Sequence, residues 1–348
     1  MAKENYLTAA WRGSGAGALP VSCKRIWPGL AISIVIALAA TFVSTAYGGP
    51  QLLYALFFGL AFHFLSQDAA CRPGLDFCSK TLLRVGIAML GVRITFEQVS
   101  SLGLGPLMIV AAAVVSTIVL GLVLARLFGR PMAEGLLSGG AVAICGASAA
   151  LAISALLPRT KENEQFTLLT VVGVTSLSTL AMIVYPVVVH FARLDATAAG
   201  IFIGGTIHDV AQVVGAGYLI SNHAGDVATL VKLTRVACLV PVIMVAAALY
   251  RRGAGSVQPN AVRPPLLPMF LVGFLCLMLA NSLHLVPAGA AAVMNSASRA
   301  CLVMAIAALG VKTSFQALAS LGWQPVLMLV AETVWIALVV LVAIRFPI

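Results

Sequence analysis

Long stretches without a charged residue constrain this chain more than any other feature of its sequence. Residues 26–67, 98–125, 135–158, 165–192 and 264–298 contain no Asp, Glu, Lys or Arg. An apolar helix needs about 20 residues to cross the hydrocarbon core of a bilayer, so each stretch can hold one crossing, and the first and last can hold more. With 61% hydrophobic and 9% charged residues and a mean hydropathy of +1.05, a soluble domain of this length is excluded.

The hydrophobic pattern predicts an all-α polytopic membrane protein with about 10–11 transmembrane segments. We place these segments at 29–47, 51–67, 82–95, 104–125, 133–157, 165–190, 196–220, 230–250, 266–284, 298–313 and 324–345. Residues 1–28 are then a basic cytoplasmic tail, and residues 29–348 form a single transmembrane domain of the transporter type. The connecting loops are too short to hold a soluble catalytic domain, so we expect the activity to lie within the bilayer.

An internal duplication is the second constraint. Residues 79–106 recur as residues 298–325, with 12 identities in 28 aligned positions. The predicted segments place seven crossings between the copies, an odd number, so the second copy should be upside down relative to the first. Inverted repeats are typical of secondary transporters, which bind their substrate near the bilayer midplane. The equivalent basic residues, which we predict to be membrane anchors, are Arg93 with Lys312 and Lys80 with Arg299.

The basic residues favour one orientation in the membrane. With the N-terminus in the cytoplasm, eleven crossings put most of the 21 Lys and Arg residues on the cytoplasmic side or at its helix ends. The formal net charge of +10 does not indicate nucleic acid, because these residues are scattered at helix ends without interleaved aromatic residues. We expect the bilayer and its anionic lipids to be their partners.

Two glycine-rich segments differ from ordinary spans and supply the predicted site. The first contains Gly139, Gly140, Cys145 and Ser148, and the second contains Gly204, Gly205, Thr206, His208, Asp209 and Gln212. Small residues let helices pack closely in lipid, which is one interpretation. We favour the other, a helix broken near the midplane, where unpaired N–H groups and a positive half-helix end hold an anion.

The pair His208 and Asp209 is the strongest candidate for a coupling site, because it lies inside an apolar stretch where charge is expensive to bury. We expect Asp209 to take up and release a proton or to hold a cation, and His208 to titrate near neutral pH. Gln212 follows His208 by about one helical turn and is a polar ligand or a hydrogen-bond partner. The alternative is a satisfied polar cluster that ties the broken helix to a neighbour.

Three more ionisable residues lie in predicted spans. Lys232 and Arg235, three positions apart, follow the second glycine-rich segment and form the best cationic pair for an anionic substrate. At the outer interface they would instead be anchors whose side chains reach the headgroups. Glu332 interrupts the last span and needs a partner or a proton, which leaves both coupling and an interhelical salt bridge open.

The topology of the glycine-rich segments has two solutions. As full crossings they point the same way, which does not suit inverted equivalents, whereas as re-entrant hairpins they enter from opposite sides. The distribution of basic residues barely distinguishes the two solutions. We prefer discontinuous crossing helices, because about 25 apolar residues are ample for a crossing and tight for a hairpin.

Four motifs resemble those of the YeiH-type family of bacterial inner-membrane proteins, which are described as sulfate exporters. They are Leu90 to Phe96, Gly139 to Ala150, Gly204 to Gly217 and Leu309 to Phe315. The resemblance covers nearly the whole chain from about residue 28 onward. More distantly, the order of these helices is similar to the bile-acid symporter and cation/proton antiporter superfamily, which implies a panel-and-core fold with crossed discontinuous helices.

The resemblance implies a secondary transporter that exports sulfate or a related sulfur oxyanion, and the residues agree on a small anion with proton coupling through His208 or Asp209. One alternative is a cation/proton antiporter in which Asp209 and Glu332 bind the cation. A second is an intramembrane enzyme with Cys145 or Ser148 as nucleophile and His208 as base. We expect no metal and no cofactor, because neither ligand spacing for a metal nor a phosphate loop is present in the sequence.

Overall fold

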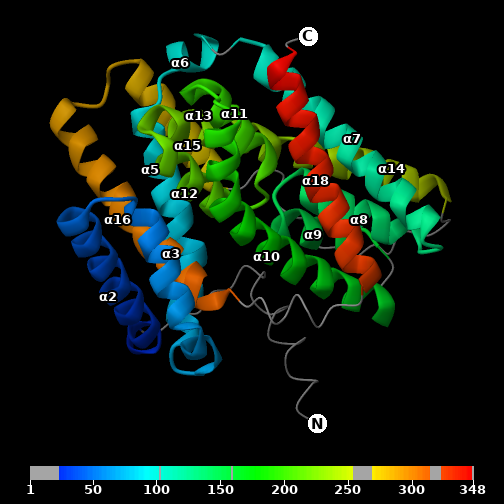
Figure 1. Ribbon diagram of the computed structural model, residues 1–348, viewed down its shortest axis with the longest axis horizontal. Coiled ribbons are helices and arrows are strands. Elements are labelled where there is room, and N and C mark those ends of the chain that lie inside the picture. Colours follow the sequence, from blue (N-terminus) through cyan, green and yellow to red (C-terminus); the bar gives the residue numbers. More distant parts are fainter. Residues whose placement is uncertain (1–22, 102, 158–159, 254–268, 314–322, 347–348) are drawn as a thin grey trace.

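The computed structural model describes residues 23–101, 103–157, 160–253, 269–313 and 323–346 (Figure 1). Their regular secondary structure is entirely helical. Six of the helices are long and apolar enough to cross a membrane, and four shorter apolar helices accompany them. The prediction of an all-α polytopic membrane protein is therefore confirmed. Most of the basic tail, and residues 314–322 of the second repeat copy, lie outside the described residues.

The helices follow the apolar segments, and polar side chains begin several of them. Thr160, Asp195 and Ser221 each accept a hydrogen bond from a backbone N–H in the first turn of the next helix. The elements in chain order are α2 (Cys23–Tyr47), α3 (Gln51–Ala61), η1 (His63–Gln67), α4 (Arg72–Asp76), η2 (Phe77–Leu82), α5 (Leu83–Leu90), η3 (Gly91–Arg93), α6 (Phe96–Ser101), α7 (Gly105–Leu127), α8 (Met132–Ala143), α9 (Ala147–Ser154), α10 (Lys161–Phe191), α11 (Ala196–Thr206), α12 (Val210–Ile220), α13 (Asn222–Ala237), α14 (Leu239–Gly253), α15 (Met269–Ser282), α16 (Ala288–Lys312) and α18 (Trp323–Arg345).

The helices form two groups (Figure 1). The first group contains α2, α3, α5, α15 and α16, and the second contains α7 to α13 and α18. Glycine allows the closest contacts in the first group. A Cβ atom on Gly310 of α16 would lie 2.4 Å from the carbonyl oxygen of Leu56 in α3, so the two backbones approach at a distance that only glycine permits.

The two repeat copies run antiparallel. Lys312, at the end of α16, donates a hydrogen bond to Asp76, which precedes η2. Farther along, Ser298 of α16 donates to the carbonyl oxygen of Gly86 in α5. Later residues of one copy therefore lie beside earlier residues of the other. This antiparallel packing agrees with the expected inverted relation, which stays a prediction.

The first glycine-rich segment forms a re-entrant hairpin from α8 and α9. A Cβ atom on Gly140 of α8 would lie 2.3 Å from Cδ1 of Ile153 in α9. Farther from the turn, Leu137 of α8 and Leu157 after α9 belong to one apolar cluster. Earlier residues of α8 thus lie beside later residues of the α9 segment. The two helices are therefore antiparallel, and the chain turns back between them.

The second glycine-rich segment forms a hairpin from α11 and α12. Gly200 and Gly204 of α11 lie against Val227 and Val231 of α13, so α11 and α13 run in the same direction. In contrast, Gly217 of α12 lies against the neighbouring turn of α13 at Gly225 and Ala228, as expected for an antiparallel pair joined at Ser221. Because α12 is antiparallel to α13 and α11 is parallel to it, α11 and α12 are antiparallel to each other.

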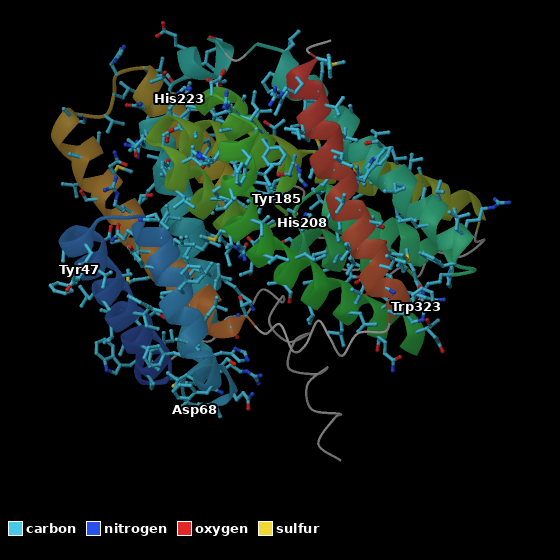
Figure 2. The ribbon with its side chains drawn as sticks, viewed as in Figure 1. Tyr47, Asp68, Tyr185, His208, His223 and Trp323 are labelled. Carbon is cyan, nitrogen blue, oxygen red and sulfur yellow. The ribbon has the colours of Figure 1, made fainter. Side chains whose placement is uncertain are left out.

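The two hairpins enter from opposite ends of the bundle, which Figure 2 marks with His223 and Trp323. Oγ1 of Thr197 in α11 lies 3.0 Å from Nε2 of His223 in α13. At the other end, Arg130, just before α8, donates to Gln324, the neighbour of Trp323. We call these ends the His223 side and the Trp323 side.

The preference for discontinuous crossing helices is therefore wrong, and the re-entrant solution holds for both segments. Each half-helix has only 8 to 12 residues. At 1.5 Å per residue it spans roughly half of a bilayer. The apolar length of each segment was sufficient for either solution, and the contacts between glycine-lined helix faces decide between them.

The hairpin topology predicts that single cysteines at Thr197 and at His223, in a cysteine-free background, react with an impermeant thiol reagent from the same side of the membrane. A cysteine at Glu162, an exposed position at the start of α10, should react from the opposite side. Labelling of intact cells against inverted vesicles measures this. Opposite labelling of positions 197 and 223 would restore the crossing solution.

Candidate substrate site at the tips of two hairpins

The tips of the two hairpins touch in the interior of the bundle. The first tip consists of Ile144, Cys145 and Gly146, and the second of Ile207, His208 and Asp209. A Cβ atom on Gly146 would lie 3.6 Å from the Cβ atom of His208. Gly146 has a φ of 65°, a conformation that glycine adopts without strain, and this sharp turn ends the first half-helix.

Lys232 of α13 binds both tips. Its Nζ donates to the carbonyl oxygen of Ile144 at 2.7 Å and to that of Ile207 at 2.9 Å. The side chain is completely buried, and it forms no ion pair with any residue that the structure describes. These two carbonyls follow directly after α8 and α11, so a single ammonium group satisfies the ends of two half-helices at once.

Arg235 extends the same arrangement one turn later on α13. Its guanidinium donates to the carbonyl oxygens of Val142 and Ala143 at the end of α8, and to those of Gly204 and Ile207 at the end of α11. Arg235 is also completely buried. The interpretation of this pair as anchors at the outer interface is thereby wrong, because both side chains lie at the hairpin tips.

The arrangement gives the tips a positive electrostatic character. The C-terminal ends of α8 and α11 carry partial negative charge, which Lys232 and Arg235 compensate with two full charges. The N-terminal ends of α9 and α12, with partial positive charge, begin at the same tips. Asp209 caps α12 by accepting from the backbone N–H of Ala211, but Gly146 offers α9 no side-chain cap. An anion fits this balance better than a bare cation does.

His208 is held in place by two elements. Nδ1 lies 3.2 Å from the carbonyl oxygen of Val142, and Nε2 lies 3.0 Å from Oγ1 of Thr333 in α18. Both ring nitrogens are therefore engaged, and the ring is completely buried. Figure 2 shows His208 near the centre of the bundle. This geometry does not support the enzyme alternative, because neither nitrogen is directed at Cys145 or Ser148.

Glu332 lies next to Thr333 and contacts the other hairpin. Its Oε1 accepts a hydrogen bond of 2.7 Å from the Ser138 hydroxyl of α8. Its Oε2 is buried without a hydrogen-bond partner among the described residues, and no cation there forms an ion pair with it. The interhelical partner is thus a serine hydroxyl, so α18 contacts one hairpin through Glu332 and the other through Thr333.

A band of hydroxyl groups from α10 supports the second tip. Ser178 Oγ accepts from the backbone N–H of Asp209 at 2.9 Å and lies 3.4 Å from Oε1 of Gln212. The amide nitrogen of Gln212 donates to Thr179 at 3.3 Å. Asp209 and Gln212 thus form a polar cluster with α10, which agrees with the alternative of a satisfied cluster that ties the broken helix to a neighbour. Sequence reasoning missed these hydroxyls, although the run from Thr175 to Thr179 is an unusual density of Ser and Thr for a membrane span.

The remaining predicted residues separate into two kinds. Gly139, Gly140, Gly204, Gly205 and Thr206 lie inside α8 and α11 and are buried against neighbouring helices. Cys145 is buried in the first tip, whereas Ser148, in the first turn of α9, is exposed. The double glycines therefore bring the helices together, and Ser148 is the predicted small polar residue that faces away from the packed interior.

Replacing Lys232 with Met should destabilise the protein by about 1–3 kcal/mol, because it leaves the buried carbonyl of Ile144 without a donor and removes one of the two donors to the carbonyl of Ile207. The matched control is Lys80→Met, whose side chain is 65% exposed and which should change stability by about 0.5 kcal/mol or less. Thermal unfolding of the detergent-solubilised protein measures both variants. Equal unfolding temperatures would contradict a capping role for Lys232.

Comparisons with known proteins identify relatives along almost the whole chain. A family model described as conserved hypothetical protein 698 matches residues 28–329. The UPF0324 membrane protein CT0845 of Chlorobaculum tepidum is 50% identical over 93% of this chain and 90% of its own length. The UPF0324 membrane protein TauZ of Paracoccus denitrificans is 46% identical over 92% of this chain and 96% of its own. The resemblance to YeiH-type proteins is confirmed, and the chain belongs to this family of UPF0324 membrane proteins.

Proposed function

We propose that this protein is a secondary transporter that carries a small anion across the bacterial inner membrane, with its N-terminus in the cytoplasm. The observation that carries this proposal is the meeting of two oppositely inserted hairpins at a buried cationic pair, Lys232 and Arg235. Discontinuous helices that meet inside the bilayer are the usual way in which transporters hold a charged substrate, because irregular backbone is tolerated only where it lines a site.

The substrate would bind beside the N-terminal end of α9. This end has no side-chain cap, and Ser148 in its first turn presents an exposed hydroxyl with no hydrogen bond to the described residues. A tetrahedral oxyanion accepts hydrogen bonds from backbone N–H groups and from a hydroxyl in this geometry. Sulfate or a related sulfur oxyanion, which the YeiH-type resemblance implies, has this chemistry.

Proton coupling is proposed to act through Asp209, with His208 positioning the tip. Asp209 is the carboxylate at the junction of the hairpins, it is only partly buried, and it lies within electrostatic range of Lys232 and Lys312. Protonation would change the charge that an incoming anion meets. Glu332 is the second candidate, because its Oε2 has no hydrogen-bond partner among the described residues.

Asp209→Asn should abolish the stimulation of oxyanion flux by a pH gradient while leaving the fold intact, because Asn caps a helix as well as Asp does. The measurement is efflux of labelled sulfate and sulfite from proteoliposomes with and without an imposed gradient. The control is Glu162→Gln, an exposed carboxyl at the start of α10. Wild-type protein that is folded but carries sodium or potassium against protons, and no oxyanion, would favour the cation antiporter instead.

Ser148→Ala should raise the KM for the transported anion roughly three- to tenfold, the loss of about one hydrogen bond to a charged ligand. Ser154→Ala, at the other end of α9, removes a hydroxyl that already donates to the backbone of Leu151 and should leave the KM unchanged. Initial rates over a range of anion concentrations compare the two variants. An unchanged KM in Ser148→Ala would remove this hydroxyl from the site.

A further inference from the structure

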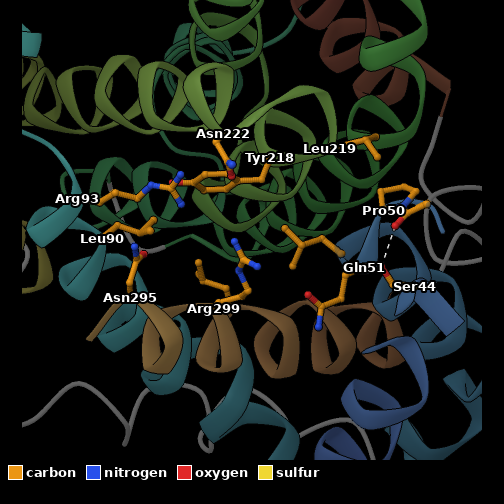
Figure 3. A pocket seen from close by; sticks show the side chains of 13 residues that line it. Ser44, Pro50, Gln51, Leu90, Arg93, Tyr218, Leu219, Asn222, Asn295 and Arg299 are labelled. Atoms are coloured by element: carbon orange, nitrogen blue, oxygen red, sulfur yellow. Dashed lines mark hydrogen bonds between the residues drawn. The ribbon is translucent and has the colours of Figure 1, made fainter. Parts of the chain in front are cut away.

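A polar pocket separate from the hairpin tips opens between α12 and α16 on the His223 side (Figure 3). Its cavity has a volume of about 270 Å³. The polar residues that line it are Ser44, Gln51, Arg93, Tyr218, Asn222, Asn295 and Arg299. We call this cavity the Arg299 pocket. Its lining comes from both helix groups and from both repeat copies, and it includes two arginines.

The two arginines of the pocket differ in how their charge is balanced. The Nε atom of Arg93 lies 3.3 Å from the Asp226 carboxylate, and its guanidinium lies over the ring of Tyr218. Arg299 forms no ion pair and no hydrogen bond with the described residues. Figure 3 shows its guanidinium directed from α16 into the cavity, toward Tyr218.

Arg299 has an exposed side chain. It lies eleven residues after the start of α16, a helix that is long and apolar enough to cross the bilayer. Eleven residues of helix correspond to a rise of about 16 Å along the helix axis. A cation without a counter-charge in such a helix is compensated by water or by a ligand.

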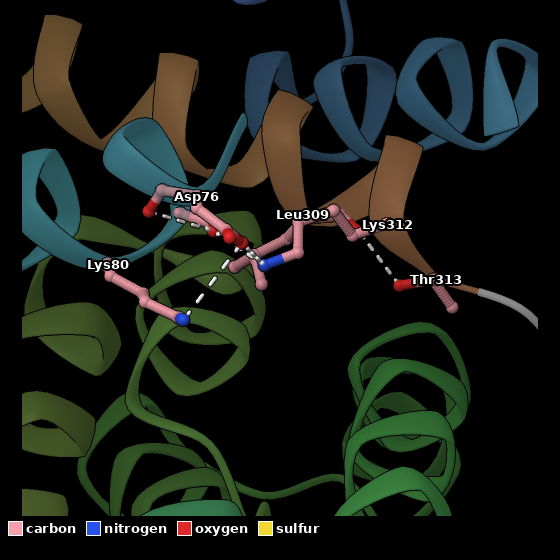
Figure 4. A network of polar contacts seen from close by, with 6 residues as sticks. Asp76, Lys80, Leu309, Lys312 and Thr313 are labelled. Carbon is pink, nitrogen blue, oxygen red and sulfur yellow. Dashed lines mark hydrogen bonds and ion pairs between the residues drawn. The ribbon is translucent and has the colours of Figure 1, made fainter. Parts of the chain in front are cut away.

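The equivalent position in the first repeat copy shows what is absent from the second. There Lys80 and Lys312 both contact the Asp76 carboxylate, at 4.0 and 2.5 Å (Figure 4). The residue that corresponds to Asp76 at the same offset is Asn295, which lines the Arg299 pocket. A neutral amide thus replaces the carboxylate that balances the first copy, and the second copy keeps its cation.

We propose that the Arg299 pocket binds an oxyanion, which supplies the negative charge that Asn295 lacks. The guanidinium of Arg299 is the main ligand, with the side-chain amides of Asn222 and Asn295 as further donors and Arg93 as a second positive charge. The volume suits a sulfate or phosphate group. This site lies beyond the one proposed at the hairpin tips, and it does not depend on the direction or coupling of transport.

The oxyanion has two possible sources, a free ion or the headgroup of an anionic lipid. A second hollow of about 560 Å³ lies between α2 and α16 and shares Gln51, Asn295 and Arg299 with the pocket. Its other walls are largely apolar, including Leu38 and Val303, and it has room for part of an acyl chain. The headgroup chemistry is the same in both cases, so the experiment must separate them.

The test compares the purified full-length protein with Arg299→Gln and with Lys80→Gln, its repeat-equivalent control. One arm measures binding of labelled sulfate in neutral detergent, and the other counts retained phosphatidylglycerol by native mass spectrometry. Arg299→Gln should weaken one of the two ligands about tenfold, as expected for one charge-assisted contact, and Lys80→Gln should not. Loss of sulfate identifies a free ion, and loss of phosphatidylglycerol identifies the headgroup.

The proposal is overturned if Arg299→Gln binds both ligands as the wild type does, or if Lys80→Gln reduces them equally, since a uniform loss indicates only net charge. Asp209→Asn provides the separation from the transport site, because it should impair gradient-driven flux and leave binding in the Arg299 pocket unchanged. Absence of oxyanion flux from the wild type would contradict the transport proposal and would leave the proposal for the Arg299 pocket unaffected.

Discussion

Six hydrogen bonds from two buried cations to backbone carbonyls determine how the centre of this protein is built. A helix that ends inside a bilayer leaves carbonyl groups that neither water nor a neighbouring strand can satisfy. Lys232 and Arg235 meet this requirement for α8 and α11 together, which fixes both hairpin ends against α13. The cost of burying two charges is offset because the same bonds complete two helices.

The two hairpins are alike in form but differ in their contacts. On the His223 side, α12 packs against α3 and α16 of the first helix group, and Arg93 pairs with Asp226 of α13. On the Trp323 side, α9 packs chiefly against α8, α10 and α14, and Ser148 is exposed. The first helix group therefore covers the hairpin that enters from the His223 side more fully than the hairpin that enters from the Trp323 side. This asymmetry fits the proposed transport function, in which such a protein alternates between two states.

The sequence identified where the helices break and which ionisable residues gather there, because double glycines and intramembrane charges are rare enough to be informative. It could not distinguish crossing from re-entrant segments, since both need about 25 apolar residues and differ only in which helix faces touch. The hydrogen-bond acceptors of Lys232 and Arg235 could not be predicted either. They are backbone carbonyl groups, which every residue type has, so no sequence pattern marks them. Arg299 was interpreted as an anchor because its place in the lining of a pocket cannot be predicted from the sequence.

The capping of α8 by α13 also constrains the order in which the helices can reach their final positions during synthesis. Arg235 lies 92 residues beyond Ala143, whose carbonyl it satisfies, and α9, α10, α11 and α12 are synthesised in between. During synthesis the first hairpin therefore lacks the donors that hold its tip. Its final position depends on a helix that leaves the ribosome several seconds later at about 5–20 residues per second. The hairpin of α8 and α9 therefore reaches its final position in the membrane only after α13 has been inserted.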